Sequence, residues 1–565
     1  MAFQISPGVN ISEVDLTTVV PSVSTTAGAF AGPFVWGPVN KIKLIDSELT
    51  LSKTFGRPDA NCASSFFTAA NFLSYGNNLQ VVRSIAVTSR NAAGVGFGNL
   101  LVNNEDDFEQ NYLFSDNAEA YGSFIARYPG TLGNSIKVSV CDNKNNFESW
   151  TYRNYFTSGP STSAQATAAG GFNDEMHIVV IDEDGLFTGT KGAILETFAF
   201  VSKASDAVLN GDTNYYKQVI FNQSKYVYAI DPIDYTNTNA SWGRPSLTNF
   251  FQLDTVKNVS LQSGTYGMPI DGELQGAYEL FNNKESVDVS LIITGAASVP
   301  VQQYIINNIA SSRGDCVAFI SPPKANVVNQ SGNETTNINA WLTVLNVAAG
   351  PGSYTVADSG WKYQYDKYAN IYRWVPLNGD IAGLCVYTDS VRDPWFSPAG
   401  FNRGAIKNCI KLAWNPSKTY RDVLYAAGVN PVVSFPGQGT VLFGDKTLQN
   451  KPSAFDRINV RRLFITLEKS ISTAAKFSLF ELNDEFTRAQ FVALVTPFLR
   501  DIQGRRGITD FKVVCDTTNN TPQVIDSNQF VGDIYIKPAR STNYIQLNFV
   551  AVGTGVDFAT IVGAV

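Results

Sequence analysis

The clearest hydrophobic pattern lies near the C-terminal end of the chain. Between residues 483 and 504, apolar side chains recur at i, i+3, i+4, i+7, i+8 and i+11, which predicts an amphipathic helix. Asn483 is a good N-cap, Pro497 is expected to kink the helix, and Gly504 is expected to end it. The apolar positions are Phe491, Leu494, Val495, Phe498, Leu499 and Ile502.

Shorter patterns surround this helix. A second helix is predicted over 455–476, and strands are predicted over 511–515 and 534–536. Residues 544–552 alternate between apolar and polar positions, with Ile545, Leu547 and Phe549 on one face. This last strand has no obvious local partner.

Residues 284–450 follow a strand–helix–strand order. Strands over 289–293 and 316–320 flank a helix over 301–312, which implies a parallel pair with a right-handed crossover. Another strand is predicted over 381–387 and a helix over 416–428. Closer to the N-terminus, a helix over 62–75 precedes a strand over 79–83. The middle of the chain is therefore expected to be α/β.

A long stretch from about residue 92 to residue 283 differs in composition from the rest of the chain. It is rich in Gly, Asn, Ser and Thr, with short strands over 136–140 and 177–181, and it reads as a β-rich insertion. Residues 158–171 are almost uncharged and small, so a flexible surface loop is expected there. At the N-terminus, Val9, Ile11 and Val14 form a strand-like arm that must find a sheet elsewhere.

Charge restricts the classes of function. The 565 residues carry 42 Lys and Arg against 49 Asp and Glu, a net charge of −7, which argues against general nucleic-acid binding. Only 16% of the residues are charged, which suits a protein that meets many copies of itself. Neither a secretory leader nor a run of 18 apolar residues is present, so no membrane insertion is expected.

Candidate catalytic groups are few. The only histidine, His177, stands near Asp182 and is expected to be a surface residue. The six cysteines form no CxxC pair, so neither a zinc site nor a disulfide framework is predicted. Residues 439–447 resemble a phosphate-binding loop, but Asp445 stands where the lysine belongs. No catalytic, cofactor or metal residue is therefore predicted. The sequence does not exclude a hydrolase that uses a pair of carboxylates, although no particular pair stands out.

Arg505 and Arg506 directly follow the amphipathic helix predicted between residues 483 and 504, which we call the striped helix. They have two interpretations: a solvated helix end, where cations offset the helix dipole, or a charged contact with an acidic partner. Arg461 and Arg462 are candidates to join that contact.

Several motifs taken together resemble contractile tail sheath proteins, and most closely the sheaths of T-even-type phages. The resemblance covers both ends and the middle of the chain and is weakest in the insertion. The motifs that carry it are residues 6–9 (SPGV), 36–38 (WGP), 128–135 (YPGTLGNS), 486–491 (FTRAQF), 504–508 (GRRGI), 515–522 (CDTTNNTP) and 535–541 (YIKPARS).

The resemblance implies a mechanical function without enzyme activity or a cofactor. Subunits of that family stack as six-membered rings around a tail tube in a metastable extended state. A baseplate signal then triggers contraction, which drives the tube through the host envelope for genome ejection. The implied partners are other copies of the chain, the tail tube protein, and the baseplate and tail terminator proteins. The implied location is the virion, after assembly in the host cytoplasm. A self-assembling surface-layer or adhesin-type protein is the alternative.

The expected fold is a multidomain α+β and α/β protein. We expect a linking arm (1–22), a middle domain in two parts (23–95 and 284–450), an outer insertion (96–283) and an inner domain (451–565). The resemblance implies that the middle domain is subtilisin-like without proteolysis. Strand exchange between subunits is assigned to Val9, Ile11, Val14, Ile545, Leu547 and Phe549. A tube-facing helix and loop are assigned to Asp484, Arg488, Arg500, Arg505 and Arg506.

Overall fold

A seven-stranded sheet runs through the larger of two units into which the chain divides, Val20–Leu479. The computed structural model describes residues 20, 23–97, 100–113, 121–234, 237 and 239–547. Neighbouring strands of the sheet are parallel, except that β2 is antiparallel to β3. The spatial order is β18 (Val429–Asn430), β14 (Thr355–Asp358), β13 (Val317–Ile320), β12 (Leu291–Ile293), β1 (Gly28–Gly32), β3 (Leu79–Arg83) and β2 (Ile42–Ile45).

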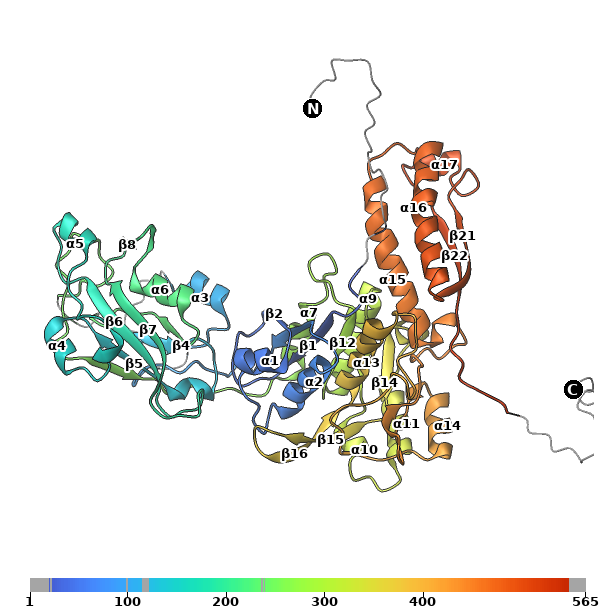
Figure 1. The fold of residues 1–565 in the computed structure, drawn as a ribbon, viewed down its shortest axis with the longest axis horizontal. Coiled ribbons are helices and arrows are strands. Elements are labelled where there is room, and N and C mark those ends of the chain that lie inside the picture. Colours follow the sequence, from blue (N-terminus) through green and yellow to red (C-terminus); the bar gives the residue numbers. More distant parts are fainter. Residues whose placement is uncertain are drawn as a thin grey trace, which may run out of the picture. The chain divides into compact units, whose positions relative to one another are not determined.

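Helices cover both faces of this sheet (Figure 1). On one face α2 (Ala63–Leu73) and α13 (Asn378–Val391) pack into the largest hydrophobic core. On the other face lie α7 (Asp271–Glu279) and α8 (Val299–Tyr304), which continues into a π-helical turn over Ile305–Ala310. The strand–helix–strand prediction is confirmed, because β12 and β13 pair in parallel across this helical crossover.

Smaller elements complete the body of this unit. A three-stranded sheet has the order β16 (Ile371–Pro376), β15 (Trp361–Asp366) and β17 (Lys411–Leu412), and β19 (Val432–Phe435) forms a hairpin with β20 (Gly439–Leu442). The remaining helices of eight residues or more in this body are α1 (Glu48–Phe55), α11 (Glu334–Leu345), α14 (Lys418–Ala426) and α15 (Ile458–Ala475).

The insertion has a sheet of its own. Its antiparallel strands run in the order β11 (Lys257–Ser260), β5 (Ile136–Cys141), β6 (Glu175–Asp182) and β7 (Ala193–Ser202). The strands predicted over 136–140 and 177–181 are therefore confirmed. A second pair, β4 (Phe124–Ala126) and β10 (Val227–Ala229), packs with this sheet and with α6 (Tyr216–Gln223) in one hydrophobic core.

The smaller unit is built around the predicted striped helix, α16 (Glu485–Gly504). Phe491, Val495, Leu499 and Ile502 are buried along one side of it. The helix lies against a hairpin of β21 (Ile508–Val514) and β22 (Asp533–Pro538), between which a short helix, α17 (Pro522–Asp526), is inserted. Asp484 is the N-cap in place of the expected Asn483, because its carboxylate accepts the Thr487 N–H at 2.8 Å.

Two predictions of local structure are wrong. Residues 381–387 lie within α13 and are not a strand; most of this helix is buried, so its apolar run gives no clear period. The expected loop over 158–171 contains a short helix, α5 (Ala164–Ala169), which begins where the Ser163 hydroxyl accepts the Ala166 N–H.

Candidate interaction surfaces

The hairpin of the smaller unit has few strand partners. β21 and β22 pair with each other through registers such as Phe511 with Ile536 and Val513 with Ile534. Among the residues of this unit that the structure describes, neither strand pairs with a third one. A two-stranded sheet is marginal by itself, and a free edge offers a row of unpaired N–H and C=O groups. The hairpin can therefore accept further strands.

An open groove lies between α16 and β21. Its lining contains residues of α16 and of β21 but none of β22, so it lies on the β21 side of the helix. Mostly small or apolar side chains line it, from Ala489, Val492, Ala493, Thr496, Pro497, Val513, Cys515 and Asp516. An extended segment added to β21 finds an apolar floor there for every second side chain.

The predicted strand-exchange residues are only partly described. Ile545 and Leu547 are 78% and 71% exposed, in a segment that forms neither helix nor strand. Tyr544 beside them is 82% exposed. Val9, Ile11, Val14 and Phe549 lie outside the described residues. The described part of the C-terminal segment thus presents apolar side chains that its own unit does not cover.

The predicted tube-facing residues separate into two groups. Arg500, Arg505 and Arg506 are exposed around the C-terminal end of α16, and Arg505 approaches Asp501 at 3.5 Å. At the other end, Arg488 is buried and donates to the side-chain oxygen of Asn483 at 2.9 Å. Asp484 caps the helix, and its hydrogen bond from the Thr487 amide lowers the pKa of its carboxyl. Arg488 and Asp484 thus hold the start of the helix, and the cations near its end face solvent.

Arg461 and Arg462, the candidates to join a charged contact with an acidic partner, are buried within their own unit. Arg462 forms a buried ion pair with Asp389, at 2.6 Å between Nη2 and Oδ2. Arg461 is stacked on the rings of Phe455 and Tyr354, with its Cζ atom 3.9 and 4.2 Å from their centroids. Both arginines hold α15 to the rest of its own unit.

His177 is also buried, where a surface position was expected. Its Nδ1 accepts the Phe200 N–H at 3.1 Å, so the proton resides on Nε2, which donates to the Ser158 carbonyl at 2.8 Å. Phe156 stacks on the ring at 4.2 Å between centroids. Burial lowers the pKa of His177, which favours the neutral ring. Its position is that of a structural histidine.

The other chemical candidates are structural as well. Asp445, in the loop that resembles a phosphate-binding motif, accepts from the Tyr425 hydroxyl and pairs with Arg457. All six cysteines are free thiols. Across the residues that the structure describes, no three His, Cys, Asp or Glu side chains gather in a way that could hold a metal ion. None of the described helices is long and apolar enough to cross a membrane.

Comparison with known proteins assigns the chain to a family. Over 99% of its length it is 33% identical to the tail sheath protein of Vibrio phage KVP40 and 32% identical to that of Enterobacteria phage T4, of which it covers 100% and 99%. The chain belongs to the phage tail sheath family.

Three family models divide the sheath chain along its length. Residues 25–83 match the tail sheath protein Gp18 domain III N-terminal region, 274–448 the phage tail sheath central domain and 450–551 the phage tail sheath C-terminal domain. The relatives are structural sheath proteins and not enzymes, so this chain is a structural component of the virion. The sequence resemblance is thereby confirmed.

Solved sheath structures share the fold at low sequence identity. The sheath tail protein Lin1278 from Listeria innocua matches 92% of this chain and 96% of its own with a TM-score of 0.53 at 11% identity. The contracted helical sheath of the anti-feeding prophage matches 97% and 99% with a TM-score of 0.51 at 12% identity. These matches confirm a mixed helix-and-strand sheath fold.

Proposed function

We propose that this sheath protein stacks as hexameric rings around a tail tube and shortens from a metastable extended state. Contraction then drives the tube through the host cell envelope for genome ejection. The observation that best supports this mechanism is the β21–β22 hairpin, which pairs with no third strand among the described residues of its unit, 480–547. The anti-feeding prophage sheath, which shares the fold, is a helical assembly in a contracted state.

Strand exchange joins neighbouring subunits in this proposal. The arm with Val9, Ile11 and Val14, or the segment with Ile545, Leu547 and Phe549, adds to the β21–β22 hairpin of another copy. Each added hydrogen bond contributes about 0.5–1.5 kcal/mol, so four bonds contribute a few kcal/mol. Such a connection tethers the subunits while their bodies move past each other.

Tube contact is assigned to the exposed end of α16. Arg500, Arg505 and Arg506 face solvent there, whereas Arg488 and Asp484 are occupied in holding the helix start. We assign the first three to the tube and the last two to positioning the helix. Baseplate and tail terminator proteins are the proposed partners at the two ends of the sheath, which assembles in the host cytoplasm.

The domain division and the character of the middle domain belong to this proposal too. The mostly parallel seven-stranded sheet with helices on both faces supports a subtilisin-like middle domain without proteolysis. Its body transmits force between the inner domain and the outer insertion. The proposed boundaries are those given from the sequence: 1–22, 23–95, 96–283, 284–450 and 451–565.

Negative-stain electron microscopy of the purified full-length protein tests the proposal. We expect hollow striated cylinders whose projections along the axis show six-fold symmetry. Flat lattices favour the surface-layer alternative, and uniform monomers at all concentrations contradict sheath assembly by this chain alone. Addition of purified tail tubes is expected to give longer and thinner cylinders around the tubes.

A further inference from the structure

In the hairpin of β15 and β16, polar side chains face the protein interior and aromatic side chains face outward, which reverses the usual arrangement. Lys362, Gln364 and Asp366 are buried on its inner side, and the alternating residues Tyr363 and Tyr365 face outward. The buried charges are paired: Lys362 lies 2.9 Å from Asp380, and Asp366 lies 2.6 Å from Arg373. Tyr365 and its cross-strand partner Tyr372 are 46% and 50% exposed. Aromatic rings left in water over a buried ionic layer indicate an interaction surface.

Cations lie over the aromatic rings on this side of the molecule. Lys411 of β17 is 5.0 Å from the ring centroid of Tyr363 and 5.7 Å from that of Trp374. At the adjoining β19–β20 hairpin, Arg421 of α14 lies 5.7 Å from the ring centroid of Phe435 in β19 and 5.8 Å from that of Phe443, which follows β20. Cation–π pairs keep these charges in place at the surface.

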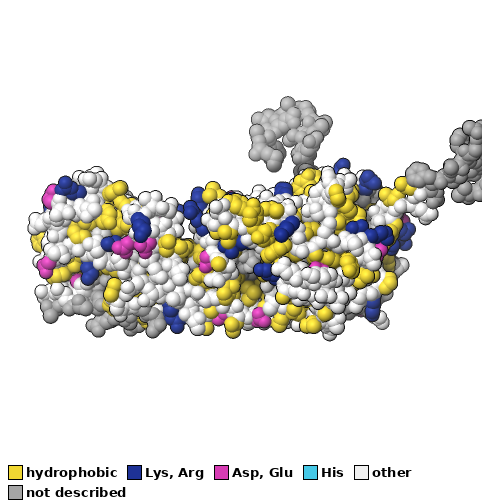
Figure 2. Space-filling model, turned by 90° about the horizontal axis from the view of Figure 1, so that it is seen from below, with side chains coloured by type: hydrophobic (Ala, Val, Ile, Leu, Met, Phe, Trp, Pro, Cys, Tyr) yellow, Lys and Arg dark blue, Asp and Glu magenta, His cyan; other side chains and the backbone are white. Residues whose placement is uncertain are grey.

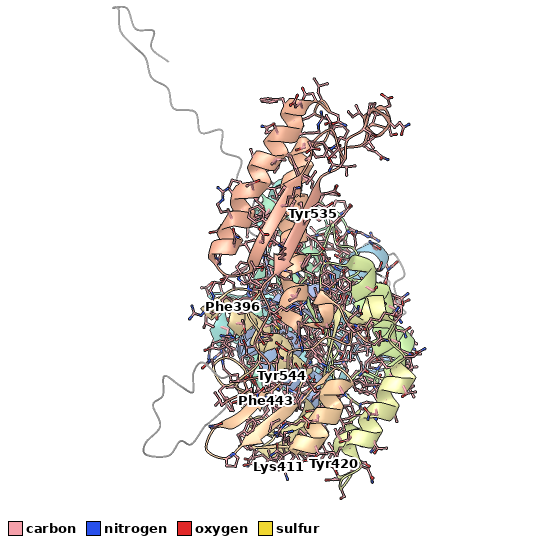
Figure 3. The ribbon with its side chains drawn as sticks, turned by 90° about the vertical axis from the view of Figure 1, so that its right-hand side faces the viewer. Phe396, Lys411, Tyr420, Phe443, Tyr535 and Tyr544 are labelled. Atoms are coloured by element: carbon pink, nitrogen blue, oxygen red, sulfur yellow. The ribbon has the colours of Figure 1, made fainter. Side chains whose placement is uncertain are left out.

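These side chains form one continuous surface. The segment after β17 joins the two hairpins, because Asn415 donates to the Ser434 carbonyl at 3.0 Å. In Figure 3, Phe443, Lys411 and Tyr420 are labelled near the lower end of the molecule and Phe396 above them. Figure 2 shows Lys and Arg among hydrophobic side chains on the underside of the body. We call this the aromatic–cationic surface and define it by Tyr365, Tyr372, Phe401, Lys411, Tyr420 and Phe443, all of which are exposed.

Its charge differs from that of the whole chain. Residues 392–443 contain six Lys and Arg against two Asp, a net charge of +4, in a chain whose net charge is −7. Aromatic and arginine residues are enriched in the centres of protein interfaces. The matching partner is therefore an acidic protein surface with exposed apolar side chains.

The same chain presents such a surface around α7. Residues 268–285 carry four Asp and Glu against one Lys, a net charge of −3. Met268, Ile270 and Leu280 are 48%, 68% and 38% exposed among these acids. Gly272 and Gly276 have no heavy atom within 4 Å of where a Cβ would stand, which leaves room for a close approach. We call residues 268–285 the α7 surface.

The two surfaces lie at different places on the seven-stranded sheet. α14, which carries Tyr420, packs beside β18 at one edge of the sheet. α7 packs on β1 and β3, near the other edge (Figure 1). Each copy can thus present one surface to the copy before it and the other to the copy after it. Such heterologous contacts form closed rings or helical polymers.

We propose that the aromatic–cationic surface of one copy binds the α7 surface of the next copy. This inference rests on the proposed assembly of the chain into a sheath, and it adds a contact between subunit bodies to the exchange of strands. In this contact Lys411 faces the carboxylate of Glu285 and Arg421 faces that of Glu279, and the exposed rings cover Ile270 and Leu280.

Site-specific photocrosslinking tests the contact directly. A benzophenone amino acid replaces Phe443 in the full-length protein, and cylinders are assembled from equal amounts of light and heavy-isotope copies. We expect mixed-isotope crosslinks that map to residues 268–285. If cylinders form and the crosslinks map elsewhere, the inference is wrong while sheath assembly stands. If no cylinders form, both ideas fail.

Charge reversal provides a second test. Lys411→Glu and Glu285→Lys are each expected to reduce the sedimentable fraction at least tenfold, and the double variant is expected to recover most of it. Lys191→Glu, a charge reversal at an exposed residue of the insertion, is the matched control and is expected to assemble normally. Unchanged assembly of both single variants overturns the inference, and circular dichroism of each variant verifies its fold.

Discussion

Arg83 donates a hydrogen bond of 2.7 Å to the carbonyl oxygen of Pro129, and in doing so it ties the outer insertion to the central sheet. The side chain is fully buried at the end of β3. Its other nitrogen atoms donate to the carbonyls of Phe34 and Gly37 at 2.8 and 2.7 Å. The guanidinium thus joins two sequence motifs of the family, 36–38 and 128–135, because its planar fork of donors reaches backbone carbonyls of both segments at once.

Replacement of Arg83 by Met is expected to destabilise this junction. Three buried carbonyl groups lose their donor, so the free energy of unfolding is expected to fall by about 3 kcal/mol or more. Urea denaturation followed by tryptophan fluorescence measures this loss. The Arg83→Lys variant keeps the charge but not the three-way geometry of the hydrogen bonds. Its free energy of unfolding is therefore expected to lie between those of the unaltered protein and the Met variant. A change below about 1 kcal/mol in the Met variant contradicts the structural role of Arg83.

The buried pair of Arg462 and Asp389 predicts a large asymmetry between single and double substitution. Asp389→Ala leaves a buried guanidinium without its partner and is expected to cost about 3–5 kcal/mol, whereas Arg462→Met with Asp389→Leu is expected to cost much less. Chemical denaturation of the three proteins gives the comparison. The exposed pair Lys418–Asp422 is the control, and its removal is expected to change stability by less than about 1 kcal/mol.

His177 predicts a pH-dependent stability of the insertion. Because burial lowers the pKa of its folded state, the unfolded chain binds a proton more readily. Stability is fully present above the unfolded pKa of about 6.5 and is lost as the pH falls from there through the folded pKa. His177→Phe is expected to reduce this loss when melting temperatures are measured at pH 7.5 and pH 5.5. Equal pH profiles for the two proteins exclude His177 as the cause.

Deletion of residues 1–20 tests the linking arm. The truncated protein is expected to fold as a monomer but not to form long sheaths, because the added strand between copies is lost. Circular dichroism checks the fold and electron microscopy checks assembly. Sheaths of normal length from this protein show that the arm is not required.

Replacement of Arg505 and Arg506 by Glu tests attachment to the tail tube. Both cations are exposed, so their reversal is expected to leave the fold intact and to weaken binding to tubes severalfold. Co-sedimentation with purified tubes measures the effect, with Lys512→Glu on the outward side of β21 as the control. Binding equal to that of the unaltered protein removes both arginines from the tube contact.

The sequence predicts the elements with clear periodicity and fails where burial is uniform. The stripe of α16 and the strand–helix–strand order around β12 and β13 are visible in the residues themselves. α13 is not, because it is surrounded by protein, and Gly379 and Gly383 lower its apparent helix propensity. Those glycines have a structural reason: a Cβ at either one would stand within 2.5 Å of Thr68 or Tyr75.

The burial of polar and charged residues is a second feature that the sequence predicts wrongly. Arg461, Arg462 and His177 are polar in sequence, yet the structure buries all three against partners from distant segments. Hydrophobic periodicity indicates which face of a helix or strand is buried, but it does not indicate which distant residues that face contacts. The sequence therefore gives no signal for these buried polar contacts. The exposed arginines at the end of α16 follow instead from helix geometry, which local sequence does predict.

The edges of the β21–β22 hairpin, which pair with no further strand in the described part of that unit, have a kinetic consequence. In a free subunit, these strand edges can pair with any extended peptide, including one from a wrongly oriented copy. If sheath polymerisation begins only on a preformed assembly platform, this wrong pairing is avoided, because each arriving subunit first meets a correctly aligned neighbour. Spontaneous polymerisation of purified protein is accordingly expected to show a lag phase and to yield some misassembled aggregates, both of which a seeding platform removes.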